Sequence, residues 1–188
     1  MGRPGSRPPE LALPVASLAA IRRSLTDEVG ANGAARALRA AGHAAGDALF
    51  AALTQPFGGD GGDADGSHLS EVSVGTFWRR LSQLFSTRGW GALMHEQVHD
   101  GLAALESPNW VEAEPNTTNR PSCFFTTGLL ANLLGRSAGS EIAVLEIECR
   151  SRGDDRCRFL FGAPETLETV YTRLRSGESI ESSVAAHV

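Results

Sequence analysis

Apolar residues recur at helical spacing through the first quarter of the chain and predict two helices. Leu18, Ile21, Leu25 and Val29 lie on one face of a helix that ends at Gly30. A second helix is predicted over residues 34–55, where many alanines favour helical structure. Its Gly42 and Gly46 lie four residues apart and allow close helix approach. We expect this seam to be internal packing, with a dimer interface as the alternative.

Further helices and strands follow the same pattern. Residues 73–86 place Phe77, Trp78, Leu81, Leu84 and Phe85 on one face and predict an amphipathic helix. Strands are predicted over 92–105, 110–114, 141–149 and 156–161, with a turn at 151–155 that joins the last two into a hairpin. A helix is predicted from Cys123 to Leu134, stopping at Gly135. Another starts at Pro164, a residue favoured in the first helical turn, and ends at Gly177.

These elements predict one α+β domain with flexible segments. The boundaries we expect are a disordered arm at 1–14, N-terminal helices that dimerise at 15–55, a flexible Gly/Asp loop at 56–69, a ligand-binding domain at 70–176 and a disordered tail at 177–188.

The composition narrows the classes of function. The 188 residues are 41% hydrophobic and 21% charged, with a net charge of −5, which is typical of a globular protein. Every basic residue is arginine, so Schiff-base and phosphate-loop lysines are excluded. The acidic balance disfavours nucleic acid. No apolar run reaches the roughly 20 residues of a membrane span, and the first residues lack a signal-peptide core; we expect a cytoplasmic protein.

Three cysteines, Cys123, Cys149 and Cys157, are the candidate chemistry. An odd number cannot form a complete disulfide framework, and clustered intracellular cysteines are often metal ligands. Zinc prefers four ligands, and a carboxylate is the natural fourth because no histidine is close in sequence. Glu146 could converge with Cys149 only if its strand bulges or ends between them, and Glu148 has a similar difficulty. The alternative is three buried cysteines acting as small apolar residues.

Three motifs resemble the 4-vinyl reductase domain family. They are a cysteine that opens a glycine-containing helix, a strand ending in Glu-x-x-Cys, and a Gly-Asp turn into Cys-x-Phe: residues 123–130, 146–149 and 153–159. The resemblance is strong over 107–162 and weaker from 18 to 106, and the loop at 58–67 matches nothing in the family. It implies a fold similar to TRAPP-complex subunits, with N-terminal helices that often dimerise and an antiparallel sheet.

The resemblance also implies a metal site. In aromatic-sensing relatives one Cys, one Glu and two more Cys bind zinc, and these positions are Cys123, Glu146, Cys149 and Cys157 here. Four protein ligands leave no open position, so the zinc is expected to be structural and to fix the start of the 123–134 helix to the hairpin. Arg150, Arg152, Arg156 and Arg158 could offset the charge of the site or, alternatively, form a small anion or nucleic-acid patch.

The relatives that sense aromatic compounds hold their ligand beside the zinc. The corresponding candidates here are Trp110, Phe77, Trp78, Phe85, Phe124, Thr127 and Val144, each of which could equally be a core residue. Trp110 is the strongest, since an indole offers an N–H donor beside an apolar face. His95 and His99 could bond a phenolic or carboxyl group, although surface or structural roles are favoured.

Three functions are compatible with these features. The first is a zinc-stabilised protein that senses or carries an apolar or aromatic, hydrocarbon-like molecule. The second is an accessory protein of (bacterio)chlorophyll or tetrapyrrole 4-vinyl reduction; no dinucleotide-binding glycine fingerprint is present, which argues against independent catalysis. The third is a TRAPP-like interaction subunit in which Cys123 is acylated. The sequence names no catalytic residue.

Overall fold

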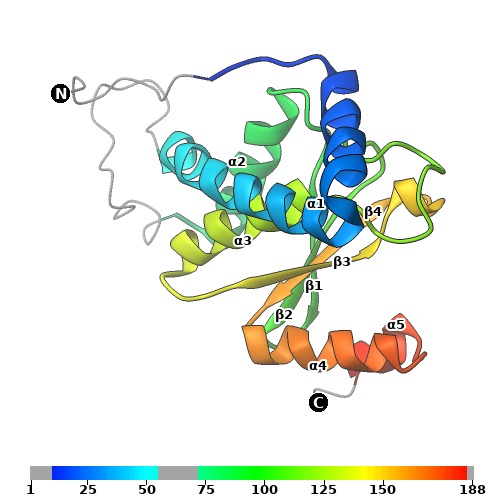
Figure 1. Cartoon of the computed structure of the whole chain (residues 1–188). Coiled ribbons are helices and arrows are strands. Elements are labelled where there is room, and N and C mark those ends of the chain that lie inside the picture. The colour runs from blue at the N-terminus through cyan, green and yellow to red at the C-terminus, as the bar shows by residue number, and fades with distance from the viewer. Residues whose placement is uncertain (1–9, 55–71, 186–188) are drawn as a thin grey trace.

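A computed structural model describes residues 10–54 and 72–185 and has a four-stranded antiparallel sheet between two layers of helices (Figure 1). The α+β class predicted from the sequence is confirmed. The strands follow the spatial order β1 (Met94–His99), β2 (Leu102–Ser107), β4 (Cys157–Gly162), β3 (Ala143–Glu148).

Two long helices cover the front face of the sheet. α1 (Val15–Thr54) lies over α3 (Phe124–Ala138), which itself packs on β3. Gly30 breaks α1 with a φ of 71°, where we predicted one helix to end and the next to follow. A Cβ at Gly42 would collide with the Phe125 carbonyl oxygen, and one at Gly128 with that of Arg39. The predicted glycine seam is therefore internal packing between α1 and α3.

The amphipathic helix α2 (Val74–Ser86) completes the front layer, with the predicted Leu81, Leu84 and Phe85 buried. Ser73 caps it, since its Oγ accepts a hydrogen bond from the Thr76 amide. The main core lies between this layer and the sheet and contains all three cysteines.

A second, aliphatic core lies on the rear face under α4 (Pro164–Arg175) and α5 (Ile180–Ala185). The start of α4 at Pro164 was predicted. The disordered tail predicted at 177–188 is wrong for the α5 residues, because Val184 of α5 is buried against this core. One apolar side chain in a polar segment is enough to hold the helix against the sheet.

Three predicted boundaries are wrong. Residues 92–105 do not form one strand: the chain turns at Asp100 and at Gly101, whose φ is 74°, so that β1 and β2 form a hairpin. Residues 110–114 form turns instead of a strand. The helix after Cys123 does not stop at Gly135 but continues to Ala138, where Gly139 takes the left-handed conformation that ends it.

Some predictions fall outside the described residues. They are the flexible loop at 56–69 and most of the arm at 1–14; residues 10–14 carry no helix or strand. Dimerisation through residues 15–55 stays a prediction.

Candidate functional site

Four metal-binding side chains meet where α3 begins beside the β3–β4 hairpin. The ligand atoms of Cys123, Glu146, Cys149 and Cys157 all lie within 4.8 Å of one another, and all four residues are buried. The Cys123 sulfur is 3.8 Å from that of Cys149 and 3.9 Å from that of Cys157. These are the four residues that the family resemblance predicted as ligands.

A bulge in β3 brings Glu146 and Cys149 together. Glu146 pairs with Phe159, but the register shifts before Glu148, and the strand ends there. A short 3-10 helix, η2 (Arg150–Arg152), then starts directly after Cys149. Both conditions stated for convergence, a bulge and a strand end, are thus met. Cys157 begins the neighbouring strand β4, and Cys123 caps the N-terminus of α3.

The chemistry of the cluster fits a cation. The Glu146 Oε2 accepts a hydrogen bond from the Cys123 backbone amide at 2.8 Å, whereas its Oε1 is buried with no partner among the described residues. An unpartnered buried carboxylate oxygen is costly, and a metal ion would satisfy it. Three sulfurs and one oxygen form a four-ligand set of the kind that zinc prefers.

The ionisation of the cluster also favours a cation. Burial raises the pKa of the Cys123 thiol and that of the Glu146 carboxyl well above their ordinary values. Hydrogen bonds from the Cys123 and Cys157 thiols lower the pKa of Cys149. Three thiolates and a carboxylate would carry a charge of −4, which a buried site cannot hold alone, and a divalent ion reduces it to −2.

The neighbouring arginines do not offset that charge. Arg156 pairs with Glu106 and Glu148, and Arg158 also pairs with Glu106, through contacts of 2.6–3.0 Å. Arg152 contacts Asp154. The role that we considered for Arg152, Arg156 and Arg158 at the metal site is therefore wrong for their described ion pairs, because other carboxylates already engage them.

Glu112 is a buried acidic residue that the sequence did not single out. Its carboxylate accepts hydrogen bonds from the amides of Phe125 and Thr126, at 2.9 and 2.8 Å, and so caps α3. Thr126 Oγ1 also donates to Glu112 and accepts from the Trp110 indole at 2.7 Å. Burial raises the pKa of Glu112 to about 7. Glu112 follows Trp110 by two residues, but only the fold shows that both reach α3.

Two of the predicted ligand contacts lie deep in the core. Trp110 and Phe85 have exposed fractions of 1% and 0%, and their rings contact each other at a centroid distance of 5.3 Å. Because Thr126 accepts the Trp110 N–H, that donor is already used. The interactions of Trp110 in this structure are those of a core residue.

Other predicted contacts form a half-buried aromatic group at α2 and the sheet. Trp78 stacks on His95 at 4.0 Å and touches Phe77 and Phe161. Val144 pairs with Phe161 across β3 and β4. The Trp78 indole N–H is buried and has no acceptor among the described residues. Burial lowers the pKa of His95, which favours the neutral ring.

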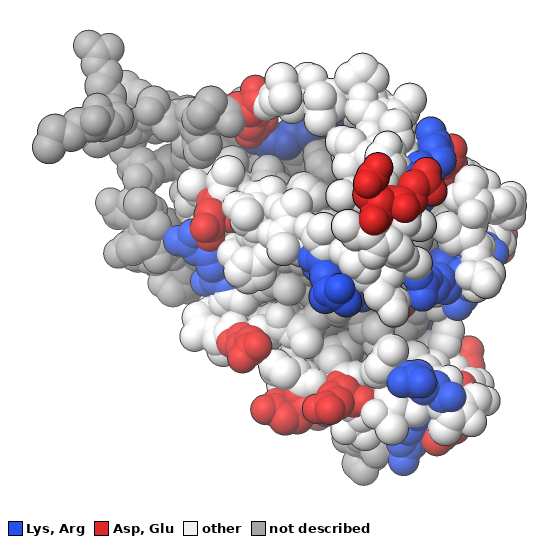
Figure 2. Space-filling view, in the orientation of Figure 1, with Lys and Arg blue, Asp and Glu red and all other residues white. Residues whose placement is uncertain are grey.

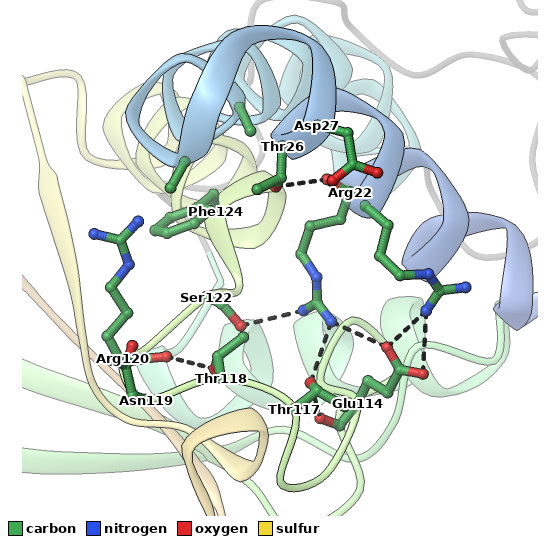
Figure 3. Close-up of a pocket in the computed structure, with 13 residues that line it drawn as sticks. Arg22, Thr26, Asp27, Glu114, Thr117, Thr118, Asn119, Arg120, Ser122 and Phe124 are labelled. Carbon is green, nitrogen blue, oxygen red and sulfur yellow. Dashed lines mark hydrogen bonds and ion pairs between the residues drawn. The ribbon is translucent and has the colours of Figure 1, made fainter.

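The last two predicted contacts lie at the start of α3. Thr127 is buried, and its hydroxyl donates to the Phe124 carbonyl at 2.8 Å. Phe124 is half-buried and lines a pocket of about 530 Å³ between α1 and the loop of residues 114–122 (Figure 3). The structure thus distributes the seven predicted contacts over three places.

The comparisons agree with this geometry. Residues 105–163 match the 4-vinyl reductase domain family, so this segment carries the domain that the motifs predicted. The fold is similar to the crystal structure of the phenol-responsive sensory domain of the transcription activator PoxR with phenol. The TM-score is 0.67 and the identity 18%, over 90% of this chain and 84% of that one.

A vinyl-4-reductase family protein from Methanocaldococcus jannaschii is also similar, with a TM-score of 0.47 and 17% identity over 81% of this chain and 82% of that one. No curated protein sequence matches the chain.

Charge and hydropathy add two observations. On the face seen in Figure 2, acidic and basic side chains are interspersed instead of forming one basic field. Within residues 10–54 and 72–185, no helix has the length and apolar character that a membrane crossing requires.

Proposed function

We propose that the protein is a zinc-stabilised binding protein for a small apolar or aromatic molecule, which it senses or carries. The single observation that carries this proposal is the buried group of three cysteines and Glu146, whose free carboxylate oxygen needs a cation. Zinc there would link α3 to the hairpin and hold the front layer of the fold together. The likeness to a phenol-sensing domain supports the ligand class.

The ligand site that we favour is the aromatic group around Trp78. An N–H donor buried without an acceptor is destabilising, and a phenolic oxygen would satisfy it while the ring packs against Phe77 and Phe161. Neutral His95 supplies a second polar partner beside the same ring. Trp110 is the weaker candidate because its N–H is already bonded.

Metal content is tested by native mass spectrometry of the purified protein, compared with the denatured mass. We expect an excess of one zinc ion per chain. A protein with no bound metal and three free thiols would contradict the proposal. It would instead favour the TRAPP-like alternative, although Cys123 has no exposed surface that an acyl donor could reach.

Ligand binding is tested by titrating phenol and, as an apolar control without the aromatic ring, cyclohexanol. Trp78→Phe keeps the ring but removes the N–H, so we expect it to weaken phenol binding about tenfold. Trp110→Phe is the matched variant; it loses a core hydrogen bond and should keep phenol affinity. Equal affinities of the wild type and Trp78→Phe would move the site elsewhere. A bound pigment in the native spectrum would favour the tetrapyrrole alternative.

A further inference from the structure

A second pocket lies away from the Trp78 group and has a different chemistry. One wall is the first half of α1, with Arg22, Arg23 and Asp27, and the other is the loop of residues 114–122 (Figure 3). Its volume of about 530 Å³ is that of a small-molecule site. Ala31, Ala34 and Phe124 form an apolar part of the lining, and the remaining residues are polar.

The charges of this pocket are unbalanced. Arg22 and Arg23 both bind the same Glu114 carboxylate, at 3.2 and 3.1 Å, so two guanidinium groups share one negative charge. The Arg22 side chain is only 10% exposed and also donates to the Ser122 hydroxyl at 3.2 Å, which holds it in place. Arg120 adds a third positive charge, whereas Asp27 adds one negative charge. The lining is net positive on a chain whose net charge is −5.

Arg120 is the group best placed to bind a ligand. Within the described part of the chain, no hydrogen bond or ion pair engages its guanidinium, although its carbonyl oxygen accepts from Thr118. In Figure 3 it extends along the side of the pocket where the Phe124 ring lies. A guanidinium binds a carboxylate with two parallel hydrogen bonds, and Phe124 beside it offers an aromatic surface.

We propose that this pocket binds a small organic acid, with its carboxylate on Arg120 and the unbalanced Arg22–Arg23 pair and its apolar body on Phe124, Ala31 and Ala34. The site is separate from the ligand site at Trp78 and does not depend on it. It shares with the metal centre only the start of α3, because Ser122 and Phe124 flank Cys123.

The test is a titration of the zinc-loaded protein with benzoate, followed by ¹H–¹⁵N NMR. We expect saturable shifts in residues 22–34 and 114–124. Benzamide has the same ring without the charge, and acetate has the charge without the ring. Both should bind at least tenfold more weakly than benzoate. Equal binding by either probe, or no saturable benzoate binding, would overturn the proposal.

Substitutions locate the contact. Arg120→Gln removes the guanidinium charge at the pocket and should weaken benzoate binding about tenfold to a hundredfold. Arg175→Gln on α4, which contacts the Tyr171 ring on the rear layer, is the matched control and should bind like the wild type. Trp78→Phe should also leave benzoate binding unchanged, which separates this site from the proposed phenol site. Unchanged benzoate affinity in Arg120→Gln would contradict the assignment.

Discussion

The two faces of the sheet are held by different chemistry. On the front face, α3 is tied to its surroundings by buried polar groups: the cysteine–glutamate cluster at Cys123 and the Glu112 carboxylate that caps the helix. The rear core is aliphatic, with Leu102, Leu160 and Val170 fully buried, and its charged groups are paired at its edge. The front face therefore depends on metal and protonation state, whereas the rear face depends on apolar contact area.

This difference has a physical origin. A buried aliphatic contact contributes in proportion to the area removed from water, whatever the solution conditions. A cluster of buried ionisable groups is stable only with its counter-charge, so it couples folding to a cation and to pH. The comparison can be tested by perturbing each face separately.

The largest expected effect comes from the front face. Cys149→Ser removes one ligand and should release the metal, at a cost of several kcal/mol in the free energy of unfolding, because metal-binding energy is folding energy. Metal content and denaturant unfolding measure it. Chelator-treated wild type is the control, since it should be destabilised to a similar extent. A metal-free Cys149→Ser that is as stable as the untreated wild type would show that the cluster is not structural.

The next largest effect is expected on the rear face. Leu160 is completely buried between β2 and β3, and Leu160→Ala should cost about 2–5 kcal/mol through lost contacts and the resulting cavity. Its metal content should stay that of the wild type, and chelation should lower its stability by the same amount as in the wild type. A strong loss of metal in Leu160→Ala would mean that the two faces are not independent.

The smallest effect is a pH dependence at Glu112. Burial raises the pKa of this carboxyl to about 7, above the value of about 4.3 expected in the unfolded chain. The folded state therefore binds the proton more tightly, and the stability that Glu112 contributes is fully present below about pH 4.3. It is lost as the pH rises to about 7, by up to about 3 kcal/mol.

Glu112→Gln tests this pH dependence, because the amide stays neutral and its oxygen can still accept from the α3 amides. The stability of the wild type relative to this variant should fall between pH 5 and pH 8. Urea unfolding of both proteins at each pH measures the difference, and metal-linked effects are common to the two. A difference that does not change with pH would mean that Glu112 has the same pKa in the folded and unfolded chains.

The elements with a strong local signal were predictable. The break at Gly30, the face of α2, the start of α4 and the β3–β4 hairpin all follow from spacing and from residues with fixed backbone preferences. The β1–β2 hairpin has a local signal too, the Asp100-Gly101 pair, a common hairpin turn sequence, which the prediction of one long strand did not use. The wrong assignment of residues 110–114 has another cause: their alternating pattern reflects contacts with α3 instead of pairing with a strand.

The candidate site divides in the same way. The sequence by itself supplied the ligand types and, through the family motifs, the four positions, because cysteine chemistry is specific to the residue. It could not decide that Glu146 reaches Cys149, since this depends on a bulge set by pairing with β4. Nor could it find Glu112 or Arg120, whose partners or neighbours come from other elements. Local backbone preference is encoded residue by residue, but burial, pairing and charge balance exist only once distant segments are in contact.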